Sequence, residues 1–173
     1  GISIMSELRT NRIVPRDGLT SGTNSAGGII QIQQGIITAP ASTSTSGSFT
    51  DTGLTATITP TRSDSKVFCM VSLGSISASS GTSTGFRLVR GSTDIGMPDS
   101  TALQSGFTNI YDADQQILAS ACFNFLDSPA TTSATTYKVT WRNSSSTSYL
   151  GRFNGSATDY NGVSTLILME VSG

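Results

Sequence analysis

The feature that most constrains the fold is a series of short apolar segments separated by Gly, Ser, Thr and Pro. In segment 49–60, apolar and threonine side chains alternate with a period of two from Leu54 to Thr59. That period is typical of a strand with one buried face. About eight to ten such segments, with turn signals every 8–12 residues, predict an all-β sandwich or jelly-roll barrel.

The same patterning locates the individual strands. We expect strands at 28–38, 49–60, 66–73, 86–90, 116–126, 136–142, 149–153 and 162–171. Segment 66–73, KVFCMVSL, is apolar on both faces, which predicts a central strand covered on both sides. Gly35 is expected at a bulge or bend. The region 95–114, which contains Pro98 and Gly106, is expected to be a long excursion at one end of the fold.

The composition narrows the class of protein. Hydrophobic residues make up 36% of the 173 residues and charged residues 12%, with 18 Gly and a net charge of −1. Disordered chains usually combine low hydrophobicity with high net charge, so this chain is expected to fold. A nucleic-acid-binding protein needs a basic surface, and a membrane span needs about 20 consecutive apolar residues. We therefore expect neither nucleic-acid binding nor membrane insertion.

A charged segment precedes the β-patterned body. Residues 6–19, SELRTNRIVPRDGL, have too few apolar side chains to form a core, and a Gly/Ser/Thr run follows them. We expect residues 1–28 to be an extended arm with a hinge, in which 1–4 are a tag remnant or a processed start, and residues 29–173 to be the β head. The residues expected to dock this arm onto a partner or onto the arms of other copies are Leu8, Arg9, Arg12, Ile13, Val14 and Arg16.

Few residues offer catalytic or metal-binding chemistry. The chain contains no His, which excludes Ser-His-Asp and Cys-His hydrolysis and histidine-based zinc sites. A pair of carboxylates could still act in a glycosidase. The best acidic pair, Asp112 and Asp114, and the single Asp159 are more simply explained as solvated loop residues. We therefore expect no enzyme activity, no catalytic residues, no metal and no cofactor.

The two cysteines and the single tryptophan lie in strand-like segments. Cys69 and Cys122 could form one disulfide, but two separate buried thiols are the favoured interpretation because free Cys is usually buried. Trp141 is expected in the core or at a subunit interface.

Aromatic side chains in the predicted loops are candidates for binding. They are Tyr111, Tyr149, Phe153 and Tyr160. Rings at loop tips can stack on sugars or insert into a partner surface. The alternative is that each ring caps the open end of the sandwich.

Several segments resemble short tail-fibre proteins of marine tailed bacteriophages, including cyanophages. They are SELRTNRIVPRDGL, FTDTGLTATITPTRSDSKVFCMVSL, LDSPATTSATTYKVTW and GVSTLILMEV, and the resemblance extends from Ser6 to Val171. It implies a homotrimer with a jelly-roll-like head, located in the virion, that binds a host-surface glycan or protein and other tail proteins. It also implies that the six arm residues from Leu8 to Arg16 attach the protein to the virion or to a stem. Segment 91–116 matches least.

Two other functions remain open from the sequence. A capsid decoration or head-fibre protein would share the arm and the β head. A glycan depolymerase is less favoured, since the long β-helix usual for such enzymes does not fit in a chain of this size and its acidic residues are scattered.

A closed homo-oligomer would cover apolar strands and protect sheet edges that a monomer exposes.

Overall fold

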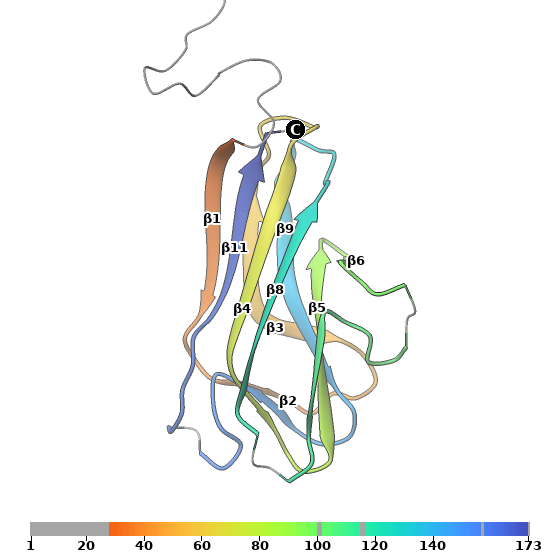
Figure 1. Ribbon diagram of the computed structural model, residues 1–173, viewed down its shortest axis with the longest axis vertical. Coiled ribbons are helices and arrows are strands. Elements are labelled where there is room, and N and C mark those ends of the chain that lie inside the picture. Colours follow the sequence, from red (N-terminus) through yellow and green to blue (C-terminus); the bar gives the residue numbers. More distant parts are fainter. Residues whose placement is uncertain (1–27, 100–101, 115–116, 157, 173) are drawn as a thin grey trace, which may run out of the picture.

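The computed structural model describes residues 28–99, 102–114, 117–156 and 158–172. They form two facing β-sheets and contain no helix (Figure 1). The all-β sandwich expected from the sequence is confirmed at this level. The strands are β1 (Ile29–Ile37), β2 (Ala41–Thr43), β3 (Thr50–Ile58), β4 (Lys66–Ala78), β5 (Thr82–Arg90), β6 (Thr93–Ile95), β7 (Thr108–Asp112), β8 (Ala119–Asp127), β9 (Thr135–Asn143), β10 (Ser148–Leu150) and β11 (Ser164–Val171).

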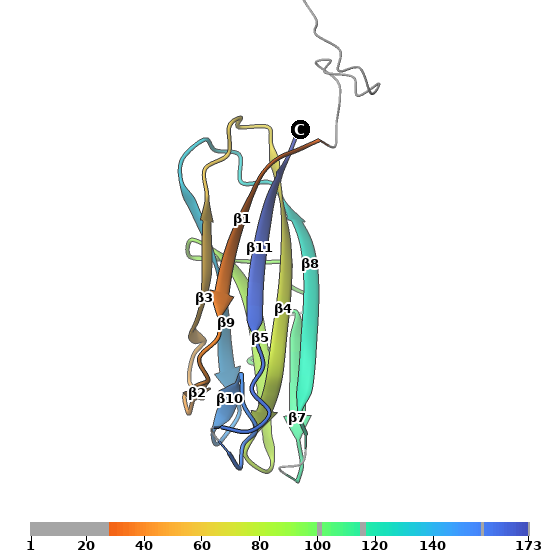
Figure 2. The same ribbon diagram turned by 90° about the vertical axis from the view of Figure 1, so that its left-hand side faces the viewer.

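The two sheets are antiparallel throughout. In the first, sheet A, β4 pairs with β8 on one side and with β11 and then β10 on the other; β1 pairs with β11, and β2 with β10. In the second, sheet B, the order is β3-β9-β5, and β6 and β7 pair with opposite ends of β5. Figure 2 shows the two layers edge-on.

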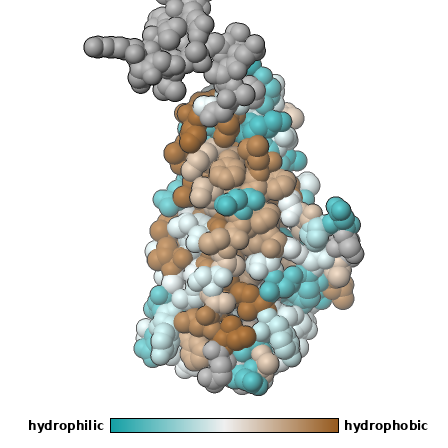
Figure 3. Space-filling view, in the orientation of Figure 1, coloured by the Kyte–Doolittle hydropathy of each residue, from teal (hydrophilic) through white to brown (hydrophobic). Residues whose placement is uncertain are grey.

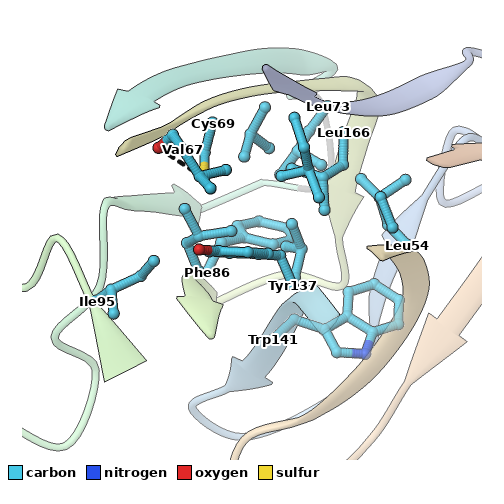
Figure 4. Close-up of a cluster of buried hydrophobic side chains, with 14 of the residues drawn as sticks. Leu54, Val67, Cys69, Leu73, Phe86, Ile95, Tyr137, Trp141 and Leu166 are labelled. Atoms are coloured by element: carbon cyan, nitrogen blue, oxygen red, sulfur yellow. Dashed lines mark hydrogen bonds between the residues drawn. The ribbon is translucent and has the colours of Figure 1, made fainter. Parts of the chain in front are cut away.

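The core lies between the sheets. Along β3 and β11, side chains alternate between buried and more exposed, as the period of two predicts. Leu73 and Leu166 of sheet A face the rings of Phe86 and Tyr137 of sheet B across the two layers, and Leu54 and Trp141 of sheet B belong to the same core (Figure 4). Trp141 is therefore a core residue, which confirms one of its two expected locations.

Three strands were not predicted: β2, β6 and β7. β2 consists of Ala, Ser and Thr, a composition that resembles a polar loop. β7 lies within the region 95–114, which was expected to be only an excursion. It adds to the edge of sheet B because its backbone pairs with β5 from Thr82 to Phe86. Pairing with a distant segment leaves little local signal in the sequence.

The expected bulge at Gly35 is wrong. The register between β1 and β11 is continuous from Gln31 to Ile37, and the irregularity lies between Ile29 and Gln31. Gly35 is needed because β1 passes close to β3: a Cβ atom there would lie 2.0 Å from the carbonyl oxygen of Thr55.

Buried polar groups close one end of the sandwich. Asp127 accepts hydrogen bonds from Arg90 at 2.9 Å and from the Tyr137 hydroxyl at 2.6 Å. Burial and this carboxylate raise the pKa of Tyr137. Nearby, Glu170 is fully buried and accepts hydrogen bonds from Gln31 at 2.6 Å and from the Thr61 amide at 2.7 Å. These contacts tie β1, β11 and the β3–β4 turn together.

The first and last described residues lie at this same end. The Ser172 amide donates a hydrogen bond to the Gly28 carbonyl at 3.0 Å. The β4–β5 turn and the segment after β10 lie at the opposite end, called here the loop end (Figures 1 and 2). The head therefore has two distinct ends along its strands.

Candidate functional site

The four predicted binding aromatics lie at the loop end. Tyr149 pairs with Ser77 near the end of β4, and Tyr111 pairs with Ser83 near the start of β5. Phe153 and Tyr160 lie in the segment between β10 and β11. The structure thus brings the predicted residues to one end of the head, where β7 and β10 lie in Figure 2, opposite the start of β1.

Three of these rings take part in two contacts, Phe153 with Tyr160 and Tyr149 with Arg152, which together are called here the aromatic cluster. The Phe153 and Tyr160 rings contact edge to face, with centroids 5.7 Å apart. The guanidinium of Arg152 lies over the Tyr149 ring, 4.6 Å from its centroid, an arrangement typical of a cation–π contact. Tyr160 is 66% exposed and has a φ of 61°, a left-handed conformation that bulky residues rarely adopt. Such conformations are enriched at ligand-binding sites.

Tyr111 stands apart from this cluster. It lies on β7 at the edge of sheet B and is 59% exposed. Among the described residues, no ring contact joins it to Tyr149, Phe153 or Tyr160. The loop end therefore presents an aromatic cluster and a separate exposed tyrosine.

The structure adds a pocket that the sequence did not indicate. Its volume is about 900 Å³, and its lining includes Phe49, Arg87, Asp94, Leu103 and Arg142. Arg87 stacks on the Phe49 ring at 3.8 Å and pairs with Asp94 at 2.7 Å. Arg142 donates hydrogen bonds to the backbone carbonyls of Ser46 and Leu103. The two arginines become neighbours because β5 and β9 are adjacent, which the sequence does not reveal.

The acidic residues form no metal site in the described ranges. The expectation that Asp112 is a solvated loop residue is wrong: it is the last residue of β7, is fully buried and accepts a hydrogen bond from the Ile117 amide. Asp114 and Asp159 are exposed, as expected. No group of three or more metal-ligating side chains occurs among the residues that the structure places. The same part of the chain contains no helix long and apolar enough to cross a membrane.

Both cysteines are free, as favoured from the sequence. Cys69 is buried in the core, and burial, followed by the charge of Asp127, raises the pKa of its thiol to about 12. The expectation that Cys122 is also buried is wrong: it lies on an outward position of β8 and is exposed.

The outer face of sheet A is unusually apolar. Phe68 and Met70 on β4 point outward and are only half-buried, although the sequence predicted that this strand is covered on both sides. Figure 3 shows hydrophobic residues extending over much of this face. We call this surface the apolar face and define it by Ile32, Ile36, Phe68, Met70, Leu126, Ile167 and Met169.

The six arm residues expected to attach to a virion, from Leu8 to Arg16, lie outside the described residues. No protein-family model matches the chain, and no curated protein shows a significant match to it.

Proposed function

We propose that this chain is a bacteriophage tail-fibre protein whose homotrimeric head attaches the virion to a host-surface receptor. The observation that carries the proposal is the division of the head into two ends. Gly28, where the arm joins the head, lies beside Ser172, and the aromatic cluster lies at the opposite end. A fibre needs this arrangement, because one end connects to the particle while the other meets the host.

The strand order supports a jelly roll as the finer description of the head. Sheet A contains β1-β11-β4-β8 and sheet B contains β3-β9-β5 followed by β6 and β7. Successive long strands, β3, β4, β5, β8, β9 and β11, alternate between the sheets. The strands of an eight-stranded double Greek key alternate in the same way. In this chain, β6 and β7 together would occupy one of the eight strand positions, and β10 and β2 would lengthen two of the other positions.

The receptor is proposed to be a glycan, bound without cleavage. Exposed aromatic rings suit the apolar faces of sugars, and the adjacent Arg152 adds hydrogen-bond donors. A trimer would present three copies of the cluster together. Once one copy has bound, the other two copies are held close to the receptor surface at a high effective concentration. Three weak contacts can then give firm attachment.

Binding of the fluorescent full chain to marine bacterial cells and to a glycan array tests this proposal. We expect Tyr160→Ala and Phe153→Ala to lower binding at least about ten-fold, because single aromatic anchors commonly dominate recognition. Thr57→Ala, an exposed change on β3 in sheet B, is the control and should bind like the wild type. Binding that is unchanged in both aromatic variants would contradict the assignment of the site, and released sugar products would contradict a non-cleaving role.

The same two-ended head also suits a capsid decoration or head fibre. Antibody labelling of intact phage particles separates the two functions. Label at the tail is expected for a tail fibre, whereas label on the capsid would favour the alternative.

A further inference from the structure

We propose that copies of this chain associate through the apolar face, with the β1–β11 half of one copy packing against the β4–β8 half of the next. This inference rests on the proposed homotrimer and adds to it the surface and the residues that meet. The occupant of the face is a second copy of this chain.

The strand register makes the face continuous across the sheet. Residues paired across neighbouring strands point to the same side, so outward residues form rows perpendicular to the strands. Each row takes one residue from β1, β11, β4 and β8, in that order. The first row is Ile32, Met169, Phe68 and Leu126, and the second is Gln34, Ile167, Met70 and Asn124. The third row is Ile36, Thr165, Ser72 and Cys122. Ile32, Ile36 and Leu126 are each more than half exposed in the single chain.

The charge distribution favours a copy as the partner. Among the described outward positions of β1, β4, β8 and β11, Lys66 is the only charged residue, and it lies at one margin. A second apolar face can therefore approach without burying an unpaired charge. The outer face of sheet B differs, since it carries Arg87, Arg142 and the Asp51–Lys138 ion pair.

The size of the face agrees with an interface. Four strands about 4.8 Å apart and about eight residues long define a flat area of roughly 500 Å². This area, which includes polar residues such as Gln34 and Asn124, lies within the roughly 300–600 Å² typical of the largest apolar patch on a monomeric protein, and such a patch is often functional. The side chains stand out from the sheet, so the accessible area exceeds the flat area.

The width of sheet A also fits three copies. Three sheets, each about 19 Å wide and forming the sides of a triangular prism, lie about 5.5 Å from the central axis. Stacked sheets are about 10 Å apart, so side chains from each reach about 5 Å. Three apolar faces would thus meet at the axis and fill it, whereas four sheets would leave a central void.

Rotation about an axis parallel to the strands preserves height along that axis. Residues that meet between copies therefore come from the same row. Ile36 at one edge of its row then faces Cys122 at the other edge of the neighbouring copy. The same symmetry places every Gly28 at one end and every aromatic cluster at the other.

Disulfide cross-linking of the full chain tests the inference. We expect Ile36→Cys to form dimers and trimers with the native Cys122 when copper phenanthroline is added, as read on a non-reducing denaturing gel. Adding Cys122→Ser to this variant should remove the trimer band. Thr57→Cys, which places the same number of thiols on the exposed face of sheet B, is the matched control and should remain monomeric on the gel.

Failure of this interface is distinguishable from failure of the proposed function. A monomer band for Ile36→Cys, or equal cross-linking of Thr57→Cys, would overturn the interface even if the protein binds host cells. A trimer band that depends on Cys122 would support the interface even if no host cell or glycan is bound.

Discussion

At the residue scale, Glu170 shows how a buried charge can support the fold. Burial alone would raise the pKa of its carboxyl, but hydrogen bonds from Gln31 and Thr61 outweigh this effect and lower the pKa to about 2. A carboxyl whose pKa is lower in the folded than in the unfolded state stabilises the fold above its unfolded pKa. That stabilisation is lost as the pH falls from about 4.5 to about 2.

Glu170→Gln tests this contribution. The substitution places an amide group where an oxygen now accepts from Gln31, so two donors face each other in a buried site. We expect the free energy of unfolding to fall by about 3 kcal/mol at pH 7 and by much less at pH 2, as measured by urea unfolding. Asp159→Asn, at an exposed position, is the control. Equal losses for Glu170→Gln at both pH values would contradict the account.

At the element scale, the alternation of apolar and polar residues was sufficient to predict the long strands, but not which strands lie beside one another in a sheet. The period of two in β3 correctly assigned Leu54 and Ile58 to the buried face. The pocket around Arg87 and Arg142 could not be predicted, because it depends on β5 lying beside β9. The sequence indicated Tyr149, Phe153 and Tyr160 only as separate candidates, and the edge-to-face contact of Phe153 and Tyr160 depends on how their loop folds back.

The close approach of β1 to β3 at Gly35 leads to a second prediction. A Cβ atom at residue 35 would clash with the backbone of Thr55, which cannot move without disturbing β3. Gly35→Ala should therefore lower the free energy of unfolding by about 1–3 kcal/mol in thermal or urea unfolding. Gly47→Ala has nothing within 4 Å of the added methyl group and should be nearly neutral. A neutral Gly35→Ala would show that the strands separate more easily than proposed.

At the scale of the whole molecule, β4 carries the most informative pattern. Its sequence is apolar on both faces, yet the described residues of one chain cover only the face with Val67 and Cys69. Phe68 and Met70 on the other face remain half-exposed. The sequence therefore predicted a covering that a single chain does not supply, and the proposed partner copy supplies it.

The mass of the full chain in solution tests the central claim most directly. By light scattering at micromolar concentration, we expect three times the 17.9 kDa of one chain for the wild type and for the control Thr57→Glu on sheet B. Leu126→Glu, 54% exposed in the single chain, should fold but give the mass of a monomer, because association would bury its charge against an apolar surface. A monomeric wild type, or a Leu126→Glu variant that remains trimeric, would contradict assembly through the apolar face.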